Sequence, residues 1–161
     1  MGGNLPSSAT SCLLPIFWQL FSSPTCRGLI RQNQFGNLQH YFLQKTIIRA
    51  VATLRVQQVC PREVLSFLME LAKYNDNSRN SFSDSYYTSE LIKAMKDTLT
   101  PAIIVRGSSS VSSLPWEART VVEEAVRCLN MDTQMPSYKA DISQILVYIS
   151  ELETFSRNKA R

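Results

Sequence analysis

The sequence predicts an all-α fold in which antiparallel helix pairs stack as a HEAT/armadillo-like α-solenoid. Three observations favour this class: apolar residues recur at helical spacing, no segment alternates as a strand does, and prolines or polar clusters separate the periodic segments. Helix starts are expected near residues 38, 61, 86, 116 and 138. Two such helices form a unit of roughly 45 to 55 residues, close to the HEAT and armadillo period of about 40–47. Short connections between consecutive helices favour antiparallel neighbours.

The first part of the chain changes from a polar leader to a helical pattern. Residues 1–11 are rich in Gly, Ser, Pro and Asn and predict a flexible leader, whereas the apolar residues 12–21 predict a short helix or a buried segment. Small polar residues at 33–37 predict a turn. A helix is expected from Leu38, with one buried face made of Leu43, Ile47, Ala50, Val51 and Leu54.

The second long helix is expected to begin at Cys60-Pro61. A proline at the first helical position sacrifices no hydrogen bond, and Glu63 places a negative charge at the positive end of the helix dipole. The buried stripe that follows is expected to contain Val64, Leu65, Leu68, Leu71 and Ala72.

Two segments that break helices divide the rest of the chain. Residues 75–85 are rich in Asn, Ser and Asp, whose side chains compete for backbone hydrogen bonds, and residues 106–113 contain five serines and a glycine. Helices are expected at 86–99, from about 116, and after Pro136. Their inward residues are expected to be Leu91, Ile92, Met95 and Leu99; Ala118, Val121, Val122, Ala125, Val126 and Leu129; and Ile142, Ile145, Leu146, Ile149 and Leu152. The predicted organisation is a leader at 1–11, a helical region at 12–155 with loops near 74–86 and 101–115, and a basic tail at 156–161.

Positive charge is concentrated in the first part of the chain. The chain has 17 basic and 13 acidic residues, yet residues 1–62 contain no Asp or Glu. One-sided positive charge attracts polyanions, although six basic residues can equally form an ordinary solvated surface. The candidate polyanion-facing residues are Arg27, Arg31, Lys45, Arg49, Arg55 and Arg62.

The residues needed for catalysis or metal binding are not arranged in any recognisable motif. His40 is the single histidine and lies within no His-Glu-x-x-His or Gly-x-Ser-x-Gly sequence. The glycines form no phosphate-binding loop, and the four cysteines lie too far apart in sequence for a paired metal motif. We therefore expect no enzyme, no catalytic or metal-binding residues, no cofactor and no small-molecule substrate. The longest apolar run is about nine residues, against roughly 20 for a membrane span, so no membrane partner is expected.

The segment 74–87 is the most unusual part of the sequence because aromatic residues alternate with Asn and Asp. Aromatic side chains on an ordered loop can anchor a partner protein, since they bury a large area at a low entropic cost. The alternative is that they hold the loop against the helices. The candidate interface residues are Tyr74, Asn75, Asp76, Asn77, Phe82, Asp84, Tyr86 and Tyr87.

Several blocks of the sequence resemble, in the same order, the family of subunit 2 of the general transcription factor TFIID. The likeness covers residues 21–138 and is carried by Tyr41-Phe42-Leu43-Gln44-Lys45, Cys60-Pro61-Arg62-Glu63-Val64-Leu65, Lys73-Tyr74-Asn75-Asp76-Asn77, Phe82-Ser83-Asp84-Ser85-Tyr86-Tyr87, Thr100-Pro101-Ala102, Leu129-Asn130-Met131 and Pro136-Ser137-Tyr138. The leader and the serine-rich loop do not follow the family pattern.

The resemblance implies a nuclear protein that works in RNA polymerase II preinitiation. Members of this family carry an aminopeptidase-like region followed by HEAT-type helical repeats, and the matching blocks look like the helical part. The implied partners are other TFIID subunits and the TATA-binding protein complex, with indirect or weak contact to promoter DNA. The chain is expected to be a fragment, a partial gene model or a truncated paralog of such a subunit.

Three functions remain open from the sequence. The first is a non-catalytic scaffold that supports assembly of the preinitiation complex and recognition of the core promoter. The second is a helical nucleic-acid-binding module that uses the basic residues of the first 62 positions. The third and least favoured is a residual peptidase.

Overall fold

The computed structural model describes residues 7–26, 28–99 and 116–134, with the side chains of residues 7–11 and 132–134 left undescribed. The described part contains the helices α1 (Ser7–Phe21), α2 (Leu38–Ala52), α3 (Arg62–Lys73), α4 (Ser85–Thr98) and α6 (Trp116–Gln134). In these residues two isolated bridges, Ser22 with Ile30 and Val56 with Val59, are the only β-type pairing. The expected loop 101–115, the expected last helix and the basic tail lie outside the described residues.

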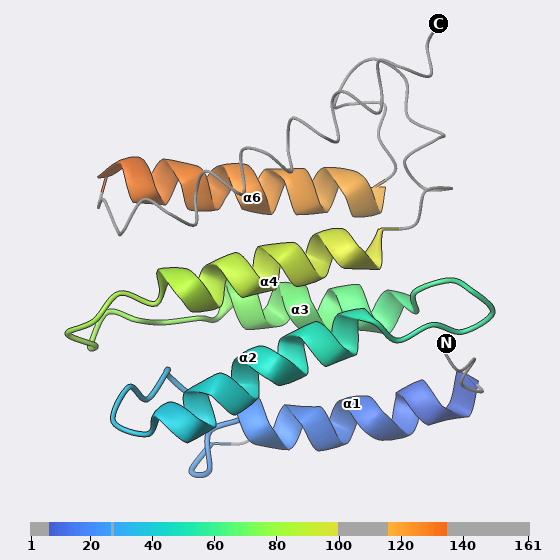
Figure 1. Cartoon of the computed structure of the whole chain (residues 1–161), viewed down its shortest axis with the longest axis horizontal. Coiled ribbons are helices and arrows are strands. Elements are labelled where there is room, and N and C mark those ends of the chain that lie inside the picture. Colours follow the sequence, from blue (N-terminus) through green and yellow to red (C-terminus); the bar gives the residue numbers. More distant parts are fainter. Residues whose placement is uncertain (1–6, 27, 100–115, 135–161) are drawn as a thin grey trace, which may run out of the picture.

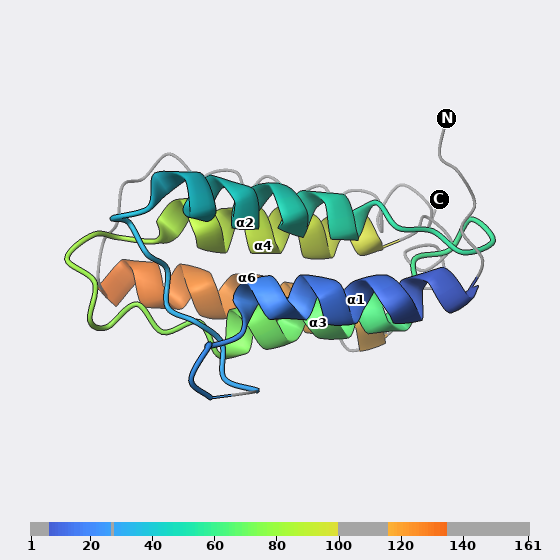
Figure 2. The same cartoon turned by 90° about the horizontal axis from the view of Figure 1, so that it is seen from below.

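The helices form two layers. Figure 2 shows α2 and α4 side by side in one layer, and α1, α3 and α6 in the other. Consecutive helices run in opposite directions, so the chain passes from one layer to the other as helix pairs stack along the molecule (Figure 1). The helices α2, α3 and α4 all contact one another. α1 packs on α2 and α3, and α6 packs on α4. The prediction of an all-α fold built from stacked antiparallel helix pairs is confirmed.

α1 begins earlier than the sequence predicted. It starts at Ser7, inside the segment expected to be a flexible leader, and continues through Pro15. The edges of the Trp18 and Phe21 rings pack against Phe67 of α3, with ring centres 5.1 and 5.7 Å apart. This packing fixes the end of the helix, and each residue added in front of it gains a backbone hydrogen bond, which explains the extension into the polar segment.

The buried face of α2 differs from the predicted one. Its buried residues are Tyr41, Gln44, Ile48, Val51 and Ala52. Of the predicted inward residues only Val51 is buried; Ile47 and Leu54 are half-buried, and Leu43 and Ala50 are exposed. The helix is rotated because α2 lies between α1 and α4, and the larger rings and chains at 41, 44 and 48 fill the space between them.

The other buried faces agree better with the pattern. In α3, Val64, Leu65, Leu68 and Leu71 are buried, and Ala72 is half-buried. All four inward residues predicted for α4 are buried. In α6, Ala118, Val121 and Ala125 are buried, while Val126 is 42% exposed.

Turns at the helix ends are set by identifiable residues. The Asn37 carboxamide oxygen accepts a hydrogen bond from the His40 backbone N–H at 3.0 Å and caps α2. α3 begins at Arg62, so Pro61 is its N-cap and not its first helical residue as predicted. Glu63 lies in the first turn, as expected. Between α2 and α3 the chain reverses through Gln57 and Gln58, whose φ angles are 51° and 68°, with reciprocal hydrogen bonds between Val56 and Val59.

Candidate protein-interaction surface at the loop end of the helix layers

Two loops that are far apart in sequence meet at one end of the molecule. Because α1 and α3 end where α2 and α4 begin, the connections 22–37 and 74–84 lie at the same end, on the left in Figure 1. The Asn80 carboxamide N–H donates to the backbone carbonyl of Asn33 at 3.0 Å, and Gln32 donates to the Asp76 carboxylate at 3.1 Å. The predicted interface segment therefore folds against a second loop.

Asn75 and Asp84, two of the predicted interface residues, form part of an internal polar network. The Asn75 carboxamide donates a hydrogen bond to the Asp84 carboxylate. Asn33 is only 3% exposed and its carboxamide N–H groups face Asn75 Oδ1 and Asp84 Oδ2 at 3.4 and 3.5 Å. The network satisfies these polar groups within the protein, so Asn75 and Asp84 hold the two loops together.

Asp76 and Asn77, also predicted for the interface, shape the tip of the loop. Hydrogen bonds from Ser78, followed by one from the Gln32 carboxamide, lower the pKa of the exposed Asp76 carboxyl, and the nearby Arg79 charge acts in the same direction. Asn77 donates to the Phe82 carbonyl at 2.8 Å. These bonds favour a single loop conformation.

The aromatic residues of the segment divide into a buried group and an exposed group. Tyr87 is only 2% exposed, and burial raises the pKa of its phenol. Its inclusion in the predicted interface is therefore wrong, because it belongs to the core beside Tyr41, with ring centres 6.5 Å apart. By contrast, Tyr74, Phe82 and Tyr86 are each more than half exposed.

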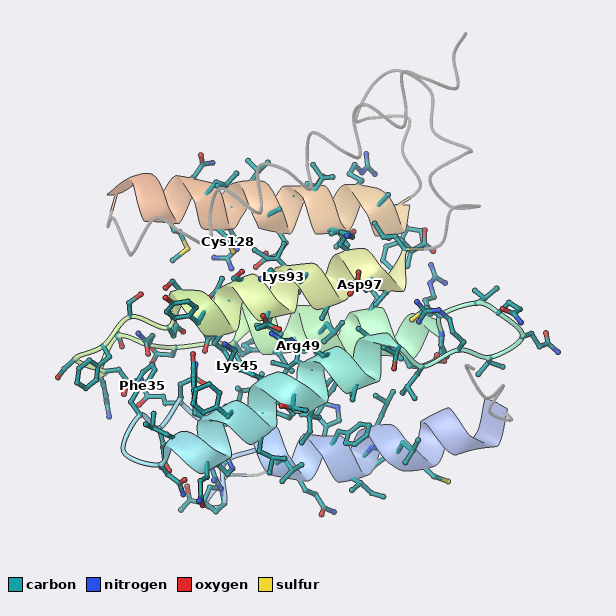
Figure 3. All side chains as sticks on the ribbon, in the orientation of Figure 1. Phe35, Lys45, Arg49, Lys93, Asp97 and Cys128 are labelled. Atoms are coloured by element: carbon teal, nitrogen blue, oxygen red, sulfur yellow. The ribbon has the colours of Figure 1, made fainter. Side chains whose placement is uncertain are left out.

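Two exposed rings and the buried ring of Tyr41 surround a lysine next to the loops. The Lys45 ammonium lies over the rings of Tyr86, Tyr41 and Phe42, at 5.3, 5.7 and 5.9 Å from their centres. Such cation–π contacts hold exposed aromatic side chains in place. Figure 3 places Lys45 between α2 and α4, near the loop end where Phe35 lies. We call Phe42, Lys45, Phe82 and Tyr86 the loop-end surface.

Phe35 links this surface to the core. Its ring centre lies 5.8 Å from that of Phe82 and 5.2 Å from that of Tyr41. Phe82 is thus 66% exposed yet supported from beneath. Tyr87 follows the second alternative that the sequence left open, because it holds the loop against the helices, whereas Phe82 and Tyr86 face solvent.

The basic residues predicted to face a polyanion do not form one patch. Arg49 of α2 donates from Nε to the Glu90 carboxylate, and Arg55 donates to the backbone carbonyls of Ala52, Leu54 and Asp97 at 2.7–2.8 Å. The Arg62 guanidinium lies 4.4 Å from the centre of the Trp116 ring, at the first residue of α3, whereas Arg31 lies in the connection between α1 and α2, where α3 ends. Arg27 lies outside the described residues. Several of these cations are engaged within the protein.

The described residues contain no group of three His, Cys, Asp or Glu side chains that could hold a metal ion. His40 is half-buried in the first turn of α2. In the part of the chain that the structure describes, no helix has the length and apolar character needed to cross a membrane.

The family of the chain follows from a match that covers almost all of its sequence. A family described as TAF2-like, TPR repeats matches residues 6–157, which includes every described helix. The chain belongs to the TFIID subunit 2 family. This family membership agrees with the resemblance seen in the sequence blocks.

Individual members of the TFIID subunit 2 family match most of the chain. The proteins named transcription initiation factor TFIID subunit 2 from Danio rerio and Gallus gallus are 48% and 44% identical to it over 130 residues, or 80% of the chain. The Drosophila melanogaster protein of the same name is 41% identical over 153 residues, or 92% of the chain. The matched region is 11–12% of each relative, so the chain spans about a tenth of their length.

The TFIID subunit 2 family description names tetratricopeptide repeats, whereas the sequence period suggested HEAT or armadillo units. Both repeat types are stacked helix pairs, so the solenoid class is unchanged. The helix pairs begin at Ser7, Arg62 and Trp116, further apart than the tetratricopeptide period of about 34 residues. In the first unit the long connection 22–37 accounts for most of the extra length, and in the second unit the 17 residues between Thr98 and Trp116 account for most of it.

Sequence reasoning missed three residues that the structure places at the loop end. Leu29 and Phe35 lie on the neighbouring loop, Arg79 lies inside the segment 74–87 but was not among its predicted interface residues, and Leu29 is 60% exposed. Phe35 lies within the predicted turn 33–37, and an aromatic residue in an otherwise polar turn was the signal that could have identified it.

Proposed function

We propose that the chain is a non-catalytic interaction region of a nuclear TFIID subunit 2, and that it supports assembly of the RNA polymerase II preinitiation complex by binding other TFIID subunits. The single observation that carries this proposal is the loop-end surface. There Phe42, Phe82 and Tyr86 are 58%, 66% and 53% exposed on an ordered part of the fold.

The loop-end surface has the properties of a protein-binding site. Exposed aromatic side chains supply most of the binding free energy in many protein interfaces. Lys45 contacts two of these rings, and Phe35 supports the third, so the rings lose little freedom on binding. Contact with the TATA-binding protein complex, and indirect or weak contact with promoter DNA, would follow from this role within TFIID.

A non-catalytic role is supported by what surrounds the ionisable groups. Asp84 and Glu90 are bonded to neighbouring side chains that hold the fold together. Burial raises the pKa of the Cys60 and Cys128 thiols, to about 11 and about 12, which disfavours the thiolate that a nucleophile needs.

The proposal can be tested by recovery of TFIID subunits from nuclear extract. The tagged chain is compared with a triple variant of the loop-end surface, Phe42→Ser, Phe82→Ser and Tyr86→Ser. A matched control replaces three exposed apolar residues elsewhere, Ile16→Ser, Val126→Ser and Met131→Ser. Quantitative mass spectrometry measures each recovered subunit, and far-UV circular dichroism checks that the variants stay helical.

We expect the unmodified chain and the control to recover TFIID subunits, and the loop-end variant to recover about tenfold less. Equal recovery by all three proteins would exclude the loop-end surface as the binding site. Recovery of no TFIID subunit by the unmodified, folded chain would contradict the proposed function itself.

A further inference from the structure

An open groove of about 1010 Å³ lies between the two loops at the loop end. One wall is the segment that contains Leu29, Arg31 and Phe35, and the other is the loop that contains Arg79 and Phe82. The groove adjoins the loop-end surface, with which it shares Phe82, but none of the described residues that line it belongs to α2 or α4.

The two walls are held together before any ligand arrives. Asn80 donates to the Asn33 carbonyl at 3.0 Å, and the Phe35 and Phe82 rings pack edge to face with their centres 5.8 Å apart. A groove that is already formed loses little conformational entropy when an extended chain binds to it.

The charged side chains that the structure describes in the groove are positive. Arg31 and Arg79 are the only charged side chains among the described residues that line it. Within the described part of the chain neither guanidinium forms an ion pair. The carboxylates of the neighbouring loop are hydrogen-bonded to other side chains, Asp76 to Gln32 and Asp84 to Asn75, and Arg79 lies near Asp76 without forming an ion pair with it in the described residues. A guanidinium pairs with a carboxylate through two parallel hydrogen bonds, which favours acidic side chains in the groove.

Apolar side chains flank these charges. Leu29 and Phe82 line the groove and are 60% and 66% exposed, so each can bury further area against a ligand. A nucleic acid would require a longer track of cations, because its affinity comes from neutralising many phosphates. Two arginines beside two apolar anchors match an acidic peptide better.

We propose that this groove binds an extended acidic segment of a partner protein, with carboxylates on Arg31 and Arg79 and an apolar side chain against Leu29 and Phe82. This inference deepens the proposed function, on which it rests, by stating the chemistry of one partner.

The test measures the binding of the full chain to an array of short random peptides. A charge-reversed variant carries Arg31→Glu and Arg79→Glu, and a control with the same change in net charge carries Arg62→Glu and Arg119→Glu, outside the groove. A third variant, Leu29→Ser with Phe82→Ser, removes the apolar contacts. Circular dichroism verifies the helical content of each protein.

We expect the unmodified chain to prefer peptides that combine Asp or Glu with Leu or Phe over isosteric Asn and Gln peptides by about tenfold. The charge-reversed variant should reverse this preference toward basic peptides, and the control should keep it. The apolar variant should weaken binding of acidic peptides by about tenfold without reversing the preference. The proposal would be overturned if the folded chain showed no preference for acidic peptides, or if the charge-reversed variant kept that preference.

Two further outcomes separate this inference from its alternatives. If a fluorescent single-stranded DNA binds, and the charge reversal but not the apolar variant abolishes its binding, the groove is a polyphosphate site and the peptide proposal is wrong. The unmodified chain could show no preference for acidic peptides while both it and the charge-reversed variant recover TFIID subunits equally well. The groove inference would then fail, and the proposed function would stand.

Discussion

The carboxylate of Glu90 on α4 accepts a hydrogen bond from Nε of Arg49 on α2, 41 residues earlier in the chain. The Glu90 side chain is only 5% exposed, and Lys93 approaches its second oxygen at 3.6 Å, whereas the Arg49 side chain is 66% exposed. Figure 3 shows Arg49 between α2 and α4, and Lys93 on α4 close by. An exposed arginine thus compensates a covered carboxylate where the helices of one layer meet.

The substitution Glu90→Gln is expected to lower the free energy of unfolding by about 1 kcal/mol, because a charge-assisted hydrogen bond is lost and the exposure of Arg49 limits its strength. Urea denaturation followed by circular dichroism measures the change. The control Glu123→Gln breaks an exposed pair with Arg119 and should cost less than about 0.5 kcal/mol.

The same pair predicts a pH dependence of stability. The hydrogen bond from Arg49 lowers the pKa of the Glu90 carboxyl in the folded state, even though its burial acts in the opposite direction. Its contribution is therefore fully present above the unfolded pKa of about 4.3 and is lost as pH falls through the lower folded value. Between about pH 5 and pH 3, the unmodified chain should lose stability more steeply than Glu90→Gln. Parallel curves would contradict a lowered pKa.

The rotation of α2 can be tested with two substitutions on the same helix. Ile48 is fully buried and Leu43 is 48% exposed, although the sequence pattern placed Leu43 inward. We expect Ile48→Ala to cost about 3 kcal/mol through lost burial and the cavity it leaves, and Leu43→Ala to cost less than about 1 kcal/mol. Chemical denaturation of both variants measures the difference. The opposite order would favour the face predicted from sequence.

The turn between α2 and α3 offers a stabilising substitution. Gln57 and Gln58 both have positive φ, the combination that a type I′ turn requires and that non-glycine residues adopt at a cost. The substitution Gln58→Gly should raise the free energy of unfolding by roughly 0.5 to 1 kcal/mol.

The matched control for the turn is Gln39→Gly in the first part of α2, where glycine should destabilise by up to about 1 kcal/mol. Thermal melts of the two variants should therefore shift in opposite directions. A loss of stability in Gln58→Gly would contradict the left-handed conformation of that residue.

The four cysteines are expected to react at two different rates. Cys12 and Cys26 are exposed, while burial raises the pKa of Cys60 to about 11 and that of Cys128 to about 12. At about pH 8, iodoacetamide should modify the exposed pair at least about tenfold faster, as peptide mass spectrometry can measure. In denaturant all four should react alike. Rapid modification of Cys128 in the folded chain would contradict its burial beside α4.

The helices themselves could largely be predicted from the sequence. Asn37, Pro61 and the polar residues before Ser85 mark starts within one or two residues of those observed, because caps and breakers act locally. The face of α2 could not be predicted, since apolar residues occupy more than one side of it. Contact with α1 and α4 selected Gln44 and Ile48 for burial over Leu43.

The sequence by itself determined an all-α chain of helix pairs and its family, because periodicity, helix caps and blocks of identical residues are properties of the chain alone. Only the tertiary structure decided which loop residues are available to a partner. Antiparallel packing brings residues 22–37 against residues 74–84. Asn75 and Asp84 therefore hydrogen-bond to each other and Tyr87 is buried, while Phe82 remains exposed. Arg31 and Arg79 line one groove for the same reason, since residues far apart in sequence become neighbours only when helices of matching length return the chain to the same end.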